Sequence, residues 1–363
     1  MNMWPDRRWL DLAGTDLPIV QAPMAGAQGS AMAAAVCQAG GLGSLPCAML
    51  DMDKARAEIA IIRQRQRAAG PLNLNFFTHE PATPDPAANR GWREALRPFY
   101  VEKGLDPDAE MPSVNRAPFD ASMCSMVEEV KPEVVSFHFG LPAADLLERV
   151  KAAGCIVISS ATSAKEARWL AERGVDAIIA QGYEAGGHRG IFLSDDISSQ
   201  AGTMALVPQV VDAVDLPVIA AGGITDGRGI AAAFALGASA VQIGTAYLFT
   251  PEATITDMHR RALANASDDG TALTNLFTGR PARGLFNRVM REIGPMSDKT
   301  PPFPTAGGTL APLKAVAEAE GTADFSSLWS GQAASLGREM DAGQLTRTLA
   351  NEALARFKTL GAV

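Results

Sequence analysis

The segment Val175–Gly190, VDAIIAQGYEAGGHRG, is a short apolar run followed directly by a glycine-rich loop. The run Val175–Gln181 predicts a buried β-strand, because it is brief, apolar and bounded by turn-forming residues. Gly186 and Gly187 let the backbone turn sharply and let a flat ligand come close. His188 follows them, and its charge can change near neutral pH. The segment therefore predicts a site at the C-terminal end of a strand, although an ordinary loop with one solvated histidine would read the same way.

Similar strand-and-turn units recur along the chain, and helical patterns separate most of them. The expected strands are Pro18–Met24, Gly41–Pro46, Pro71–Phe77, Val134–Gly140, Cys155–Ser160, Val175–Gln181, Pro217–Gly222 and Ser239–Gly244. Eight short strands alternating with helices are typical of a (β/α)₈ TIM barrel. A doubly wound open sheet is the alternative, but no GxGxxG follows the first strand, which argues against a dinucleotide-binding sheet.

Two segments depart from this alternation. We expect a barrel over residues 1–249, interrupted after the third strand by an insertion at about 78–123 with a helix near Trp92–Lys103. An insertion of this length is either a lid over the site or a passive addition. The segment 250–363 is expected to be mostly helical, with a proline-rich break at Pro301–Pro304, and to pack on the barrel.

Composition narrows the class of protein. The chain has 363 residues, 47% of them hydrophobic and 20% charged, which fits a globular protein with a substantial core. A net charge of -8 argues against a nucleic-acid binder but allows a site for a small anion. The cysteines show no CxxC pair and no spacing typical of metal ligands, so we expect free thiols and no metal. No signal peptide or long apolar stretch is present, so we expect no membrane association and a cytoplasmic location.

Ligands of such barrels bind at the C-terminal ends of the strands. This rule selects Met24, Asn75, His138, Ser160, Gln181, Gly222 and Gly244. Gly222–Gly223 and Gly244–Thr245 end consecutive strands and precede helix starts, where backbone amides favour an anion such as phosphate. The alternative is that both are merely tight turns.

Side-chain amides at the strand ends suggest the nature of the ligand. Asn75 and Gln181 can each donate and accept hydrogen bonds, as the mixed edge of a flavin ring requires. A flavin mononucleotide (FMN) is therefore a reasonable expectation, although any phosphorylated ligand would satisfy the glycine turns.

Six motifs occur in an order that resembles the nitronate monooxygenases, formerly called 2-nitropropane dioxygenases, and their class I branch in particular. They are QAPMAG (21–26), NLNFF (73–77), SFHFGLP (136–142), AQGYEAGGHRG (180–190), AAGGITDGRG (220–229) and VQIGT (241–245). The resemblance covers nearly the whole chain and extends to GRPARGLFNR and LWSGQAA in the C-terminal segment.

The resemblance implies a tightly bound FMN, no metal, and His188 as the catalytic histidine. It implies FMN contacts at Asn75, Gln181, Gly186, Gly223, Gln242, Ile243, Gly244 and Thr245, with Met24 and Gly222 in the turns around the flavin. The implied reaction is oxidation of an alkyl nitronate, such as propionate 3-nitronate, by O₂ to a carbonyl compound and nitrite. The enzyme would be a monomer or a homodimer.

Other polar residues have less certain roles. His138 ends the fourth strand facing the interior, where it either contacts substrate or fills the barrel. We expect His79 and His259 to be surface or loop residues and Arg189 to be a solvated loop charge. Two other functions remain open: an NAD(P)H-dependent flavin reductase of the quinone or enoyl-carrier-protein type, and a non-catalytic protein that binds flavin or a phosphorylated ligand.

Overall fold

A computed structural model describes residues 4–65, 70–81, 83, 85–112 and 116–361 of the chain. Its centre is a sheet of eight parallel strands in the order β1-β9-β8-β6-β5-β4-β3-β2. The strands are β1 (Ile19–Gln21), β2 (Gly43–Pro46), β3 (Leu72–Phe77), β4 (Val134–His138), β5 (Ile156–Ala161), β6 (Ala177–Gln181), β8 (Val218–Ala221) and β9 (Ala240–Ile243). A bridge between Val20 and Leu42 brings the two edges together. The predicted TIM barrel and its eight strands are confirmed.

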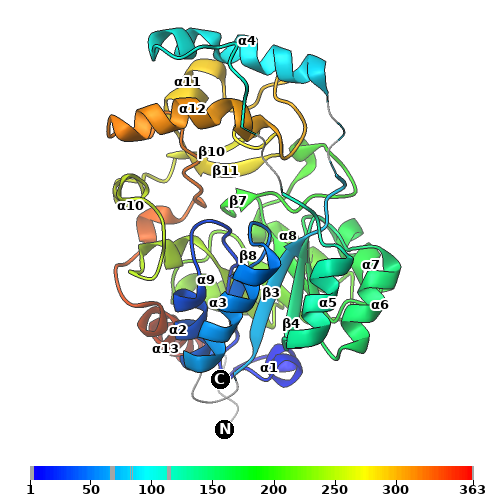
Figure 1. Ribbon diagram of the computed structural model, residues 1–363. Coiled ribbons are helices and arrows are strands. Elements are labelled where there is room, and N and C mark those ends of the chain that lie inside the picture. Colours follow the sequence, from blue (N-terminus) through cyan, green and yellow to red (C-terminus); the bar gives the residue numbers. More distant parts are fainter. Residues whose placement is uncertain (1–3, 66–69, 82, 84, 113–115, 362–363) are drawn as a thin grey trace.

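Helices cover the outside of the barrel (Figure 1). They are α2 (Ser30–Gln38), α3 (Met52–Arg65), α5 (Ala121–Val130), α6 (Ala144–Ala152), α7 (Ala164–Glu172), α8 (Thr203–Val211), α9 (Gly227–Ala235) and α13 (Ala342–Leu360), with α1 (Arg8–Ala13) preceding the first strand. The strand β3 shows how sequence divides the layers. Leu72, Leu74 and Phe76 belong to the apolar core, whereas the amide of Asn73 donates to Ser44 Oγ (2.9 Å) of the neighbouring strand.

A second layer lies over one end of the barrel (Figure 1). It contains α4 (Pro86–Glu102), α10 (Asp257–Ala264), α11 (Arg288–Ile293), α12 (Ala306–Ala319) and the antiparallel hairpin of β10 (Thr271–Thr274) and β11 (Ala282–Leu285). The insertion and the C-terminal segment build this layer together, because Trp92 Nε1 of α4 donates to the Ala306 carbonyl (3.1 Å) and Tyr100 Oη to the Thr309 carbonyl (2.6 Å). We call this layer the cap.

Two features of the later chain were not expected from the sequence, namely a hairpin with its partner strand and several short 3₁₀ turns. The hairpin β10–β11 lies in a segment expected to be mostly helical, and the two-residue strand β7 (Gly187–His188) pairs with β11. Short 3₁₀ turns lie at Ile197–Ser199 (η1), Thr245–Phe249 (η2) and Ala334–Leu336 (η3). The last helix, α13, leaves the cap and packs against α2 and α9 of the barrel. The proposed domain boundaries stay a prediction.

Candidate active site

A cavity of about 450 Å³ lies at the C-terminal ends of the barrel strands, under the cap. Nearly all of the site residues predicted from the sequence line it. They are Met24, Asn75, His138, Gln181, Gly186, His188, Gly222, Gly223, Gln242, Gly244 and Thr245. Ile243 does not line the cavity, because its side chain is buried in the apolar core. The cap adds residues that the sequence did not single out, among them Arg116, Trp329 and Gly331.

His188 reaches the cavity on β7, whose backbone is paired with the cap hairpin. His188 lies opposite Ala282 of β11, and Gly187 lies opposite Arg283. The imidazole Nε2 is 3.0 Å from Thr278 Oγ1. The ring also lies among aromatic side chains, with centroid distances of 5.4 Å to Phe303 and 5.6 Å to Trp329. The catalytic candidate is thus held between the barrel and the cap.

Gln181, the last residue of β6, clamps the backbone on both sides of His188. Its Nε2 donates to the His188 carbonyl (3.0 Å), and its Oε1 accepts from the amide of Gly190 (2.7 Å). Both polar atoms of the side chain are therefore used by the protein, although each keeps one further hydrogen or lone pair for a ligand. The clamp fixes where the imidazole points.

Arg189 is fully buried, so the expectation of a solvated loop charge is wrong. Its guanidinium donates to the carbonyls of Gly182 (2.6 Å) and Gln181 (2.7 Å) and to Gln200 Oε1 (2.7 Å). A planar group with five N–H donors can satisfy several acceptors of a bent backbone at once. Burial is the main cause that lowers the pKa of Arg189 to about 10. Arg189 therefore stabilises the loop from inside.

His138 supports the same loop. Its Nδ1 is 2.6 Å from Ser160 Oγ and its Nε2 is 3.2 Å from the His188 carbonyl. Since a carbonyl only accepts, Nε2 carries the proton and Nδ1 accepts from the Ser160 hydroxyl. Burial lowers the pKa of His138 to about 3, so the ring is neutral at physiological pH. His138 borders the cavity, but its two nitrogens hold protein atoms.

The imidazole of His188 is also neutral. Burial first, and then the positive charge of Arg116 and the nearby His138, Arg280 and His79, lower the pKa of His188 well below its usual value. Its Nδ1 has no hydrogen-bond partner among the described residues. A neutral ring that is attached at one nitrogen leaves the other for a ligand.

The other two histidines are buried, so neither lies at the surface; His79 is a loop residue after β3, as the sequence allowed, whereas His259 lies in α10. His79 Nε2 donates to the Arg116 carbonyl (2.9 Å). His259 lines the cavity from α10, donates to the Trp329 carbonyl (3.1 Å), and has its pKa lowered by burial to about 4. His79 packs against Phe77, Phe139 and Phe303. Because Phe139 and Phe303 come from other segments of the chain, local sequence does not reveal the burial of His79.

The glycine turn after β8 presents free backbone donors to the cavity. Gly222 and Gly223 have φ angles of 112° and 71°, which only glycine adopts without strain. The amides of Gly223 and Ile224 have no acceptor among the described residues. Successive free amides in such a turn form an anion-binding concavity. The phosphate site predicted at this turn would use these amides.

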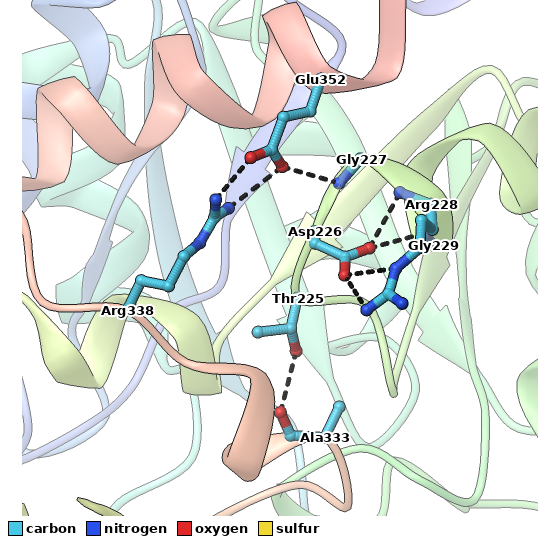
Figure 2. A network of polar contacts seen from close by, with 8 residues as sticks. All are labelled: Thr225, Asp226, Gly227, Arg228, Gly229, Ala333, Arg338 and Glu352. Atoms are coloured by element: carbon cyan, nitrogen blue, oxygen red, sulfur yellow. Dashed lines mark hydrogen bonds and ion pairs between the residues drawn. The ribbon is translucent and has the colours of Figure 1, made fainter. Parts of the chain in front are cut away.

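The start of α9, by contrast, is already occupied by carboxylates (Figure 2). Asp226 accepts from the amides of Arg228 (2.8 Å) and Gly229 (3.2 Å), and Glu352 of α13 accepts from the amide of Gly227 (3.1 Å). An anion in the cavity would therefore bind to the glycine turn rather than to the first turn of the helix. Thr245 follows β9, the neighbour of β8 in the sheet, and its hydroxyl accepts from the amide of Gly331 (2.9 Å).

Two polar atoms at the centre of the barrel differ in their partners. Asn75 Nδ2 donates to Ser136 Oγ (2.9 Å) and to the Ser136 carbonyl (3.2 Å). Gln242 Oε1 is buried and has no partner among the described residues. Because a buried acceptor without a donor is costly, Gln242 indicates a ligand with an N–H or O–H at this point.

The part of the chain that the structure describes contains no cluster of metal ligands and no membrane-spanning helix. No group of three or more His, Cys, Asp or Glu side chains in that part of the chain could hold a metal ion. The four cysteines are free thiols, as expected. No helix within the described ranges is long and apolar enough to cross a membrane.

Known proteins resemble this chain over nearly its whole length. The family model described as nitronate monooxygenase matches residues 7–352. Proteins named nitronate monooxygenase from Paraburkholderia phytofirmans and Pseudomonas aeruginosa are 43% and 42% identical, over 95% of this chain and 94% and 98% of theirs. A nitroalkane oxidase from Streptomyces ansochromogenes superimposes with a TM-score of 0.87 at 38% identity, covering 97% of this chain and 99% of its own.

A more distant solved structure, FabK from Thermotoga maritima, superimposes with a TM-score of 0.74 at 29% identity, covering 98% of this chain and 99% of its own. The family match and the relatives above 40% identity agree with the motifs and with the barrel. The chain belongs to the nitronate monooxygenase family and is an oxidoreductase.

Proposed function

We propose that this enzyme uses FMN to oxidise alkyl nitronates of the propionate 3-nitronate class with O₂, giving a carbonyl compound and nitrite. The observation that carries the proposal is the pairing of two features in one cavity. A neutral His188, anchored by Gln181 and His138, lines the same cavity as the free amides of Gly223 and Ile224. This arrangement suits a phosphorylated ring system with a small reactant beside it.

The residues fit FMN. The free amides of the turn at Gly222–Gly223 would hold the phosphate. A side chain at either glycine would press on Ala185, Thr203 or Glu184 and would displace these amides. Gln242 Oε1, which lacks a donor, would accept from a ring N–H, and Asn75 and Gly244 would border the ring. When bound, FMN supplies the redox chemistry by accepting an electron from the nitronate.

His188 would orient the nitronate. With Nε2 accepting from the Thr278 hydroxyl, Nδ1 carries the proton of the neutral ring and would donate it to a nitro oxygen, which stabilises the negative charge there. Its lowered pKa also makes the ring a weak base. The site is therefore better suited to nitronates, which have already lost the α-proton, than to neutral nitroalkanes, which must still be deprotonated.

The aromatic wall keeps water from the reacting atoms. Phe77, Phe139 and Phe303 form a small apolar cluster, and all three rings lie within 6.1 Å of the His188 ring, measured between centroids. In a site that excludes water, a hydrogen bond to a charged oxygen is stronger than in solution. The wall thus strengthens the contact that His188 provides.

The experiment is an anaerobic comparison of two reductants. The purified protein should be yellow and should release FMN on denaturation; a colourless protein that cannot be reconstituted with FMN would contradict the proposal. Propionate 3-nitronate should change the flavin spectrum without O₂, and nitrite should form once O₂ is admitted. Rapid bleaching by NADH but not by nitronate would favour the flavin reductase, and binding without turnover would favour a non-catalytic protein.

The oligomeric state, monomer or homodimer, and the cytoplasmic location of the enzyme stay predictions.

A further inference from the structure

The insertion places one arginine in the wall of the cavity. Arg116 lines the same space as His188 and His138. Its guanidinium carbon lies 5.8 Å from the centroid of Phe303, the ring that also contacts His188. Its carbonyl accepts from His79 Nε2 (2.9 Å), in the loop after β3. Arg116 is thus attached to the barrel although it belongs to the insertion.

The positive charge of Arg116 is not balanced by the protein. Its side chain has no hydrogen bond or ion pair with any described residue, and its carbonyl makes the bond to His79. Burial lowers the pKa of Arg116, which reflects loss of water around the guanidinium. Arg116 is partly buried, and a partly buried charge without a partner is unfavourable. A guanidinium is well suited to bind a carboxylate at such a place.

Among the described residues, no acidic side chain of the cavity wall forms an ion pair with Arg116. Glu318 lines the cavity, but its Oε1 accepts from Ser326 Oγ (2.7 Å) and lies 3.8 Å from Lys314 Nζ. Arg280 adds a second cation near His188; its guanidinium lies over Phe139 at 4.1 Å, and its Nε has no partner among the described residues. The surroundings of His188 are therefore positive in a chain whose net charge is -8.

We propose that Arg116 binds the carboxylate of a carboxylated nitronate and so selects such dianions over simple alkyl nitronates. This inference rests on the proposed function. The nitronate group would lie at His188, and the guanidinium of Arg116 would form charge-assisted hydrogen bonds with the second anionic group. The insertion, in this view, supplies substrate selectivity.

The test compares two nitronates in three variants. With propionate 3-nitronate, Arg116→Gln should lower kcat/KM by about ten- to hundred-fold, the effect of losing a hydrogen bond between charged groups. With butyl-1-nitronate, which lacks the carboxylate, the change should stay within about two-fold. Arg116→Lys keeps the charge and should recover part of the loss. Arg90→Gln, at an exposed arginine on α4, is the matched control and should leave both values unchanged.

A binding measurement separates this inference from the proposed function. Under anaerobic conditions, 3-nitropropionate should perturb the flavin spectrum of the wild type, and the Kd should rise about ten-fold or more in Arg116→Gln. An equal loss with both nitronates, or no loss with either, would overturn the role of Arg116. If the wild type oxidised no nitronate at all, the proposed function would fail, while the dependence of 3-nitropropionate binding on Arg116 would still decide the inference.

Discussion

At the scale of single residues, His188 is held in place by Gln181 and His138, and side chains from several strands line the cavity around it. Some of these side chains could be predicted from the sequence. Asn75, Gln181 and His188 were found because the ends of barrel strands meet at one face. The burial of His79 and Arg189 was not predicted. His79 packs against Phe303 of the C-terminal segment, and Arg189 is buried because the loop before it folds its carbonyls around the guanidinium. No local pattern marked Arg116, a single arginine in an irregular insertion.

The first prediction concerns His188 itself. His188→Asn should retain FMN, because the free amides of Gly223 and Ile224 are untouched, but should lower kcat with propionate 3-nitronate by about 10²-fold or more. Steady-state kinetics and the FMN content of the purified variant are the measurements. Unchanged turnover at full FMN content would remove His188 from the reaction.

The second prediction concerns pH. The pKa of His188 is lowered, so the ring stays neutral as the pH falls through its ordinary value of 6.5. The surrounding groups Arg116, Arg280, His138 and His79 all act in this direction. With nitronate added from an alkaline stock immediately before mixing, kcat/KM should be level between pH 8 and 6, within about two-fold. A loss of activity centred near pH 6.5 would show that the ring takes up a proton there.

At the scale of secondary structure, contacts between elements explain what local patterns could not. Ser163 and Glu166 have the spacing of a capping box, and Ser163 Oγ accepts from the amide of Glu166 (3.2 Å). The Glu166 carboxylate, however, accepts from the amides of Thr162 (2.6 Å) and Phe192 (2.7 Å). The Glu166 carboxylate in the first turn of α7 therefore also holds the loop after β7. No hydrophobic periodicity in the sequence indicates this contact.

The third prediction concerns the close contact between Gly186, directly before β7, and the backbone of Ser330 and Gly331. A Cβ at Gly186 would lie 2.5 Å from the Gly331 nitrogen and 2.6 Å from the Ser330 carbonyl carbon, so Gly186→Ala should shift the backbone before His188. We expect a loss of about 1–3 kcal/mol in the free energy of unfolding and reduced turnover. Urea denaturation and nitronate kinetics are the measurements.

The matched control is Gly91→Ala in the interior of α4, where an added Cβ meets no atom within 4 Å. It should leave turnover unchanged and stabilise the protein by up to about 1 kcal/mol. Full stability and activity in Gly186→Ala would show that a side chain fits between residue 186 and the backbone of Ser330 and Gly331.

At the scale of the whole molecule, the barrel was predictable and the cap was not. Each barrel strand carries its own short apolar run and turn, so eight local signals add up to one fold. The cap depends on Trp92 of the insertion meeting Ala306 of the C-terminal segment, and on a hairpin pairing with two residues after β6. Such pairings bring together segments that are far apart in the chain, and single-sequence patterns contain no information on them.

The fourth prediction concerns acid stability. Burial lowers the pKa of His138 to about 3 and of His259 to about 4, and it also lowers the pKa of His79. Below pH 6.5 the unfolded chain therefore binds protons that the folded chain does not, and stability falls as the pH falls. Each histidine contributes up to about 1.4 kcal/mol per pH unit.

Urea midpoints at saturating FMN should therefore drop between pH 7 and pH 5.5, above the range in which most carboxylates titrate. His259→Gln keeps a donor for the Trp329 carbonyl and should make the dependence shallower by one proton. A midpoint that does not change over this range would show that these rings titrate normally in the folded protein.

The position of α13 has a consequence for biosynthesis. This helix lies between α2 and α9, where Tyr247 Oη is 2.8 Å from Thr346 Oγ1 and Glu352 binds the amide of Gly227. The ribosome has completed every strand of the barrel by Ile243. The helix α13, which covers α2 and α9, is synthesised only about a hundred residues later. The apolar faces of α2 and α9 that α13 covers therefore stay exposed on the nascent polypeptide while the whole cap is translated. During that interval chaperones can bind this surface.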